Sequence, residues 1–128
     1  MASINKIDDT DIEIIKGDTV SMAIACSDSD DLPWDFTGYT AIMQVRKSWN
    51  DTSIPPILEL STANGCISFD TNNILLTIPA NLTESIVIKI GKESVDYVYD
   101  IDLVAPNSKV HKPLRGIFTI YSESTKSQ

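Results

Sequence analysis

Strict alternation between residues 95 and 104 constrains the fold more than any other feature of the sequence. Every second position carries an apolar side chain, and three of the positions between them carry aspartate. The apolar phase comprises Val95, Tyr97, Tyr99, Ile101 and Leu103, and the opposite phase comprises Asp96, Val98, Asp100, Asp102 and Val104. A period of two places alternate side chains on opposite faces of a strand. The segment is therefore predicted to be a long strand with one buried face.

Shorter segments with similar patterning recur along the chain and are separated by turn residues. Gly17-Asp18 and the segment 105–108 mark bends, and Asn64-Gly65 is a strong hairpin signal because both residues tolerate positive φ. One helical turn is expected at Asn81–Ser85, with Asn81 as its N-cap. Strands are expected at residues 12–14, 20–26, 40–47, 57–61, 66–70, 74–78, 95–104 and 114–121.

This pattern predicts an all-β protein, specifically an antiparallel β-sandwich with about eight short strands and at most one short helical turn. The 128 residues suit one domain, which can bury a core without a disulfide or a metal. We interpret residues 1–10 as a flexible or docking N-terminal arm, residues 11–121 as the β-sandwich domain and residues 122–128 as a polar tail.

The chain is strongly acidic, with a formal net charge of −8. This charge argues against nucleic-acid binding, which needs Lys and Arg to replace counterions, and against docking on anionic membranes. Residues 1–10 lack the apolar stretch of a signal peptide, and the longest apolar-rich run, residues 85–90, contains Lys89 and is too short to cross a bilayer. We therefore expect synthesis in a cytoplasm, with no nucleic-acid partner and no membrane insertion.

Residue types that carry catalysis are sparse. The single histidine, His111, lies near a predicted hairpin and is expected to be exposed. Cys26 and Cys66 are interpreted as reduced core residues, because two cysteines do not make a secreted disulfide framework. A second histidine or a Cys-x-x-Cys pair that could complete a zinc site is absent from the sequence. The sequence predicts no enzymatic activity, no cofactor, no metal site and no small-molecule substrate.

Asp96, Asp100 and Asp102 would share the solvent-facing side of the long strand. Cross-strand pairing with Lys112 or Arg115 is the expected explanation for three carboxylates on one face. A basic surface on another subunit is the alternative partner.

Two loops carry further candidate groups. Asp28, Asp30 and Asp31 resemble a fragment of a calcium loop but lack its glycine and distal glutamate, so we interpret them as a solvated loop. Trp49 is the one obvious exposed aromatic residue for a carbohydrate-binding module, which is an alternative function for the chain.

A series of short phrases occurs in an order typical of a known group of proteins. The phrases are Gly17-Asp18-Thr19, Asp35-Phe36-Thr37-Gly38-Tyr39, Arg46 near a strand end, Tyr97-Val98-Tyr99-Asp100 and Gly116. The series resembles small virion proteins of tailed bacteriophages, in particular siphophage tail-tip collar proteins and the N-terminal domains of baseplate proteins. The resemblance covers most of residues 14–121, and Phe36 stands where leucine is commoner in the family.

The resemblance implies that the sandwich is immunoglobulin-like. It also implies a structural virion protein of the tail, made in the bacterial host, that forms a collar or baseplate ring or an adaptor that anchors tail fibres. Its partners would be further copies of itself in a symmetric ring and other tail or fibre proteins. A head-decoration or neck protein is the alternative virion role. The candidate ring contact places the acidic strand face of one copy against lysines of the next, namely Asp96, Asp100 and Asp102 against Lys89, Lys92 and Lys109.

Overall fold

The structure is a computed structural model that describes residues 2–3, 8–27, 32–52, 55–70 and 73–122. These residues are mostly β-structure, with eight strands of four residues or more, two strands of two residues and one short helix. The elements are β1 (Ala2–Ser3), β2 (Asp8–Asp9), β3 (Ile12–Ile15), β4 (Val20–Ser27), β5 (Thr40–Arg46), β6 (Leu58–Ser61), β7 (Ile67–Asp70), β8 (Asn73–Ile78), α1 (Ala80–Glu84), β9 (Ser94–Val104) and β10 (Val110–Tyr121).

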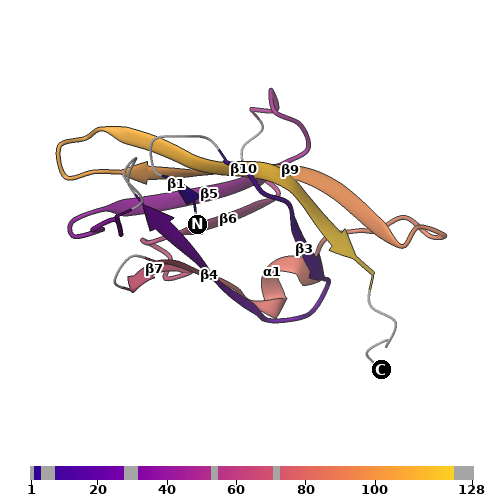
Figure 1. Ribbon diagram of the computed structural model, residues 1–128. Helices are drawn as coiled ribbons and strands as arrows, with labels where there is room; N and C mark the ends of the chain where they lie inside the picture. Colours follow the sequence, from indigo (N-terminus) through magenta and orange to yellow (C-terminus); the bar gives the residue numbers. More distant parts are fainter. Residues whose placement is uncertain (1, 4–7, 28–31, 53–54, 71–72, 123–128) are drawn as a thin grey trace.

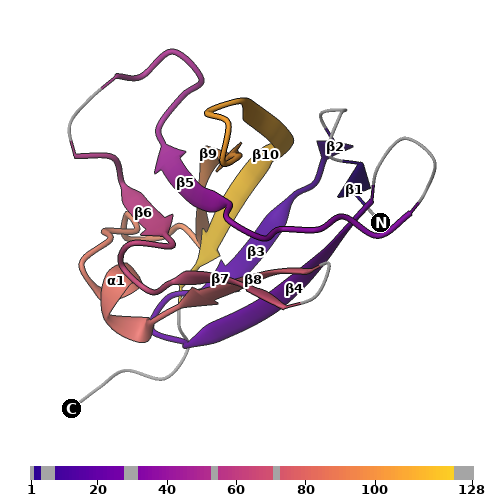
Figure 2. The ribbon, with the colours of Figure 1, turned by 90° about the vertical axis from the view of Figure 1, so that its left-hand side faces the viewer.

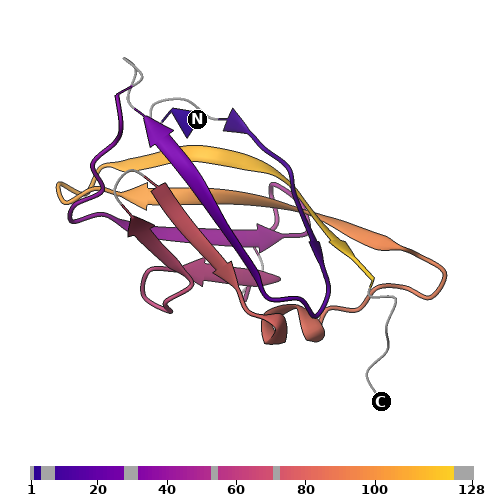
Figure 3. The same ribbon diagram turned by 60° about the horizontal axis from the view of Figure 1, so that its bottom comes forward.

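The strands form two sheets that face each other across a common core (Figures 1 and 2). The four-stranded sheet has the order β1-β4-β8-β7, and the six-stranded sheet has the order β2-β10-β9-β5-β6 with β3 also paired to β10. The six-stranded sheet curls like half a barrel around the core (Figure 2). Figure 3 shows the strands of the smaller sheet crossing those of the larger sheet obliquely.

The expectation of purely antiparallel sheets is wrong at the N-terminal segment. β1 runs parallel to β4, and β2 and β3 run parallel to β10. The segment begins on the four-stranded sheet and then passes to the six-stranded sheet, so that residues interpreted as an arm pair with both. One segment thereby covers an edge of each sheet, which removes two rows of unpaired backbone groups.

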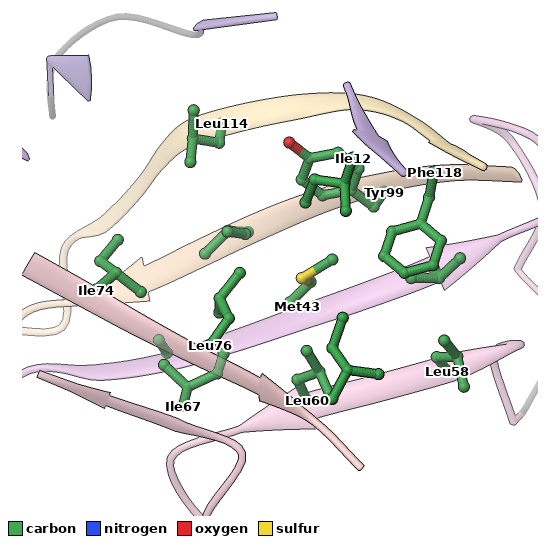
Figure 4. Packing of buried hydrophobic residues seen from close by; sticks show 14 of the residues in the cluster. Ile12, Met43, Leu58, Leu60, Ile67, Ile74, Leu76, Tyr99, Leu114 and Phe118 are labelled. Carbon is green, nitrogen blue, oxygen red and sulfur yellow. The ribbon is translucent and has the colours of Figure 1, made fainter. Parts of the chain in front are cut away.

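The predicted alternation holds in the long strands. Tyr99, Ile101 and Leu103 of β9 are buried, whereas Asp96 lies on the solvent-facing phase. The core side chains come from both sheets and interdigitate between them (Figure 4). Those labelled in Figure 4 are Ile12, Met43, Leu58, Leu60, Ile67, Ile74, Leu76, Tyr99, Leu114 and Phe118.

The Asn64-Gly65 turn is present, but the two strands that it joins do not pair with each other. β6 pairs with β5 in the large sheet, and β7 pairs with β8 in the small sheet. Gly65 has a φ of 82°, and the Asn64 side chain accepts hydrogen bonds from the N–H groups of Ser61 and Cys66 at 3.0 Å each. Local chemistry therefore specifies the turn, whereas burial of Ile67 in the core carries the next strand into the opposite sheet.

Two further expectations need correction. Helix α1 begins at Ala80 with Pro79 in the N-cap position, so Asn81 lies inside the helix instead of capping it. His111 is half-buried instead of exposed, because its ring packs edge-on against Trp34 with 6.1 Å between centroids. The acidic cluster Asp28, Asp30 and Asp31 lies outside the described residues.

The N-terminal segment is fixed at Thr10. Its N–H donates to the Arg115 carbonyl at 2.8 Å, and its own carbonyl accepts a hydrogen bond from the Tyr99 hydroxyl. A Cβ atom on Gly116 would lie only 2.1 Å from the Thr10 carbonyl oxygen. Asp11 completes the contact, since its Oδ1 accepts a hydrogen bond from the Ile117 N–H at 3.1 Å. Glycine at position 116 is therefore required by the close approach of another backbone segment.

Replacement of Gly116 by alanine is expected to lower the free energy of unfolding by roughly 2–3 kcal/mol, because the new methyl group must displace backbone from a packed contact. Denaturant unfolding measures this loss. Gly65→Ala is the matched control, because its Cβ would meet nothing within 4 Å and only its positive φ opposes the change, at a cost of about 1 kcal/mol. An equal or smaller loss for Gly116→Ala would contradict the contact.

The two cysteines are free thiols in different environments. Cys26 is fully buried in β4, whereas Cys66 is half-buried beside the Asn64-Gly65 turn. Burial raises the pKa of the Cys26 thiol from 9.0 to about 11. The folded protein thus keeps this proton at a pH where the unfolded chain loses it, so stability falls as the pH rises from about 9 to 11.

A disulfide reagent at pH 8 is expected to modify Cys66 quickly and Cys26 slowly in the folded protein, because only the thiolate reacts and Cys26 is both protonated and inaccessible. Absorbance of the released thiol gives two phases, and denaturation merges them into one. Cys66→Ser should remove the fast phase alone. Loss of the slow phase in that variant would contradict the assignment.

Candidate functional site

Charged and polar side chains gather on the outer face of the six-stranded sheet. β5 contributes Gln44 and Arg46, β9 contributes Asp100 and Asp102, and β10 contributes Lys112. These residues line a hollow of about 200 Å³, together with Trp49 and Asp51 from the loop that follows β5. We call this feature the Trp49 hollow.

The polar side chains of the Trp49 hollow form hydrogen bonds and ion pairs with one another. The Lys112 ammonium lies 2.6 Å from Asp102 Oδ1 and 4.0 Å from Asp100 Oδ2. Arg46 Nη2 donates to Gln44 Oε1 at 2.8 Å, and Gln44 Nε2 donates to Glu59 Oε1 at 2.8 Å. The expected pairing of the acidic strand face with Lys112 is therefore confirmed for Asp100 and Asp102.

Lys112 lies on the outer face of β10, beside a local irregularity of the strand. In the register of Val110 and His111, it stands opposite Asp102. The register with β9 then shifts by one residue between His111 and Leu114, a segment that includes Pro113. An extra residue of this kind changes which face the following side chains occupy. Leu114 accordingly lies in the buried phase, although Lys112, two positions before it, faces solvent.

Trp49 stands over the same sheet face from the loop between β5 and β6. Its side chain is 54% exposed, and the guanidinium carbon of Arg115 lies 5.4 Å from its ring centroid. This cation–π contact ties the loop to β10. Trp49 and Arg115 also line a second hollow of about 110 Å³, which shares Asp100 and Lys112 with the first.

Burial and the neighbouring cations act on the pKa of Asp100 in opposite directions. Partial burial raises the pKa of Asp100, and the neighbouring Asp102 raises it further, whereas Lys112 and Arg46 oppose the shift. The hydrogen bond from Lys112 to Asp102 raises the pKa of the ammonium group. Asp100 is thus a partly desolvated carboxylate whose charge is incompletely compensated.

A second surface projects beyond the sheets at the α1 end of the molecule, on the loop between α1 and β9 (Figures 1 and 3). Val87 is 80% exposed and Ile90 is fully exposed, and Lys89 and Lys92 lie on the same loop. We call these four residues the 87–92 knob. This exposure could not be predicted from the sequence, because β-branched residues in that segment also suit a strand.

An acidic groove lies at the same end, beside β3 and β10. It has a volume of about 570 Å³, and its lining includes the exposed apolar residues Ile15 and Tyr121 together with Glu13 and Asp18. Glu13 is close enough to Tyr121 that its negative charge raises the pKa of the phenol. We call this feature the β3–β10 groove.

The Gly17-Asp18-Thr19 phrase connects β3 and β4 to helix α1. Gly17 has a φ of 86° and donates its N–H to the buried Thr83 hydroxyl at 3.0 Å. That hydroxyl in turn donates to the Ala80 carbonyl at 3.2 Å, and Thr19 Oγ1 accepts a hydrogen bond from the Ala80 N–H at 3.4 Å. The phrase therefore positions α1, and with it the start of the loop that carries the knob.

The Asp35-to-Tyr39 phrase forms the connection between β4 and β5. Asp35 Oδ1 accepts hydrogen bonds from the Thr37 N–H and hydroxyl at 2.9 and 2.7 Å, which fixes the loop locally. Gly38 has a φ of 80°, and a Cβ there would lie 2.7 Å from Pro106. Tyr39 packs edge-on against Phe36 and Trp34. These residues build the fold and lie away from the Trp49 hollow.

Of the other residues that the sequence analysis singled out, Tyr97 and Asp96 lie near the knob, whereas Lys109 does not. Tyr97 is half-buried and lines a groove of about 550 Å³ under the knob, together with Asp96, Lys89 and Lys92. Asp96 accepts a hydrogen bond from the Thr119 hydroxyl at 2.8 Å. Lys109 lies in the β9–β10 turn at the opposite end of β9, so the structure does not bring it together with Lys89 and Lys92.

In comparisons with known proteins, the chain matches no family model and no curated protein. Within the described part of the chain, no helix is both long and apolar enough to cross a membrane. No group of three or more histidine, cysteine, aspartate or glutamate residues in that part is arranged to hold a metal ion.

Replacement of Lys112 by methionine is expected to raise the pKa of Asp100, because the ammonium group favours its charged form. Asp102→Asn is expected to lower the pKa of Asp100, since it removes a like charge and frees Lys112 from its bond to Asp102. Carbon-detected NMR titration of the Asp100 carboxyl measures both shifts.

Lys109→Met is the control for these variants, because Lys109 lies in the distant β9–β10 turn. It should leave the pKa of Asp100 unchanged. Shifts of the same sign in Lys112→Met and Asp102→Asn would show that the hollow is not organised by this triad.

Proposed function

We propose that the protein is a structural virion subunit of a tailed bacteriophage, made in the host cytoplasm, which forms a ring or adaptor in the tail collar or baseplate and anchors tail fibres. The ordered series of phrases that resembles such proteins supports this proposal. The observation that carries it in the structure is the 87–92 knob, which exposes Val87 and Ile90 almost completely on a projecting loop. Exposed apolar side chains of this kind mark protein-protein contacts.

We also propose that the two-sheet arrangement is an immunoglobulin-like variant. Its support is the pairing of the first strands with both sheets, the inter-sheet passage from β6 to β7 and the mixed edge on β10. Domains of this architecture present loops at the two ends of the sheets as contact surfaces. The knob lies at one such end.

A contact between copies would bring the knob of one subunit into the β3–β10 groove of the next. The knob combines Val87 and Ile90 with two lysines, and the groove combines Ile15 and Tyr121 with Glu13 and Asp18. The two surfaces match in both apolar character and charge. Since they are different parts of the same chain, the contact is heterologous and can close into a ring.

The groove is a better acidic partner for the knob than the strand face of β9. Asp100 and Asp102 are already engaged by Lys112, and Asp96 is bonded to Thr119. An intermolecular contact there would have to replace these bonds. Glu13 and Asp18 instead flank exposed apolar surface, so their burial would be coupled to removal of that surface from water.

Cryo-electron microscopy of purified particles is the decisive experiment. Multiple copies in a symmetric ring at the collar, baseplate or tail tip are the expected result. Copies on the head or neck would move the protein to the alternative virion role, and complete absence from particles would end the proposal.

Charge reversal tests the contact itself. Lys89→Glu with Lys92→Glu is expected to remove the protein from particles, because two like-charged surfaces then oppose each other. Glu13→Lys with Asp18→Lys in the same chain should restore incorporation. Lys109→Glu is the control and should be incorporated normally. Failure of the combined variant to recover, with all variants folded by circular dichroism, would contradict the knob-to-groove contact.

A further inference from the structure

Several surfaces of the protein remain outside the proposed ring contact. Among them, the Trp49 hollow is lined by ordered side chains from three strands and one loop. It shares no lining residue with the knob or with the β3–β10 groove. We infer that the Trp49 hollow is a binding site for a neutral carbohydrate, with Trp49 as the stacking surface and the polar groups of β5, β9 and β10 as hydroxyl partners.

The aromatic ring is held in place at the site before any ligand arrives. The Arg115 guanidinium lies 5.4 Å from the Trp49 centroid, while the side chain remains 54% exposed. The ring lines both the 200 Å³ hollow and the adjoining 110 Å³ hollow. A sugar ring presents a face of C–H groups that suits contact with the electron-rich face of an aromatic ring.

The polar partners are similarly fixed. Arg46, Gln44 and Glu59 form a chain of hydrogen bonds, and Lys112 is bonded to Asp102. Carboxylates accept hydrogen bonds, guanidinium and ammonium groups donate them, and the Gln amide does both, so together they can bond hydroxyl groups in either direction. Because these side chains are already ordered, little rotamer freedom is lost on binding.

The charges around the site favour an uncharged ligand. Three acidic residues and three basic residues line the two hollows, namely Asp51, Asp100, Asp102, Arg46, Lys112 and Arg115. The formal charges cancel, so neither a phosphate nor a cationic peptide gains a net attraction. Lys112 lies closer to Asp102 than to Asp100, so the Asp100 carboxylate can accept a further hydrogen bond from a ligand hydroxyl.

The size of the site also suits a small carbohydrate ligand. Volumes of about 200 and 110 Å³ lie below the range of roughly 300–1,000 Å³ typical of sites for drug-sized ligands. A ligand of one or two rings fits this space. The openness of the sheet face would let such rings belong to a longer glycan on a cell surface.

The test is an NMR titration of nitrogen-labelled protein with glucose, galactose, mannose, N-acetylglucosamine and their short oligomers. The chain has two tryptophans, so Trp49→Phe assigns the two indole signals. We expect saturable shifts of the Trp49 indole and Gln44 amide signals with at least one neutral sugar. The absence of saturable shifts with the whole panel would overturn the inference, as would tighter binding of inorganic phosphate at the same signals.

Variants separate the site from general surface effects. Trp49→Ala is expected to weaken sugar binding about tenfold or more, and Lys112→Met should weaken it as well. Ile90→Ser changes a still more exposed apolar residue in the knob and should leave binding unchanged. Unaltered affinity in Trp49→Ala would overturn the inference. A failure of binding leaves the ring contact intact, since that contact uses none of these residues.

Discussion

The carbonyl of Thr10 is the point on which the architecture depends. The chain here runs from β2 to β3 along the edge of the six-stranded sheet, and the Thr10 carbonyl is pressed against Gly116 and bonded by the Tyr99 hydroxyl. A strand edge with a side chain at position 116 could not accept the segment so closely. With glycine there, β2 and β3 pair with β10 on either side of the contact, and the large sheet gains its parallel edge. The Tyr99 side chain is therefore buried in the core, while its hydroxyl bonds the segment at the sheet edge.

A second local device links the fold to its projecting loop. The Thr83 hydroxyl is fully buried, and it joins the β3–β4 bend to the short helix through Gly17 and Ala80. A helix of five residues has little stability of its own, because nucleation is costly and few bonds repay it. Its position is set by this tertiary contact. The loop that leaves the helix is consequently presented from a fixed base, as a docking element requires.

The outer face of the large sheet shows how cross-strand pairing gathers polar groups. Lys112 stands opposite Asp102 in the register of His111, and its ammonium group reaches two carboxylates on β9. The register shift beside Pro113 then returns Leu114 to the core. The β5–β6 loop then covers this cluster with Trp49, held by Arg115. Polar groups from three strands and one loop thereby converge, although they are up to 71 positions apart in the sequence.

The strands could be predicted from the sequence, because a buried face and a solvated face impose a period of two on side chains, as in residues 95–104. A local turn could be predicted as well, since Asn64 and Gly65 act within their own turn. Which strands pair with each other depends on tertiary packing. Asn64-Gly65 specifies a turn, yet β6 and β7 enter different sheets because burial of Ile67 outweighs the local preference for a hairpin. The exposure of Trp49 and the cross-strand pairing of Asp100 and Asp102 could be predicted from the sequence. Their convergence in one hollow and the exposure of the knob could not, because both depend on how the whole chain packs.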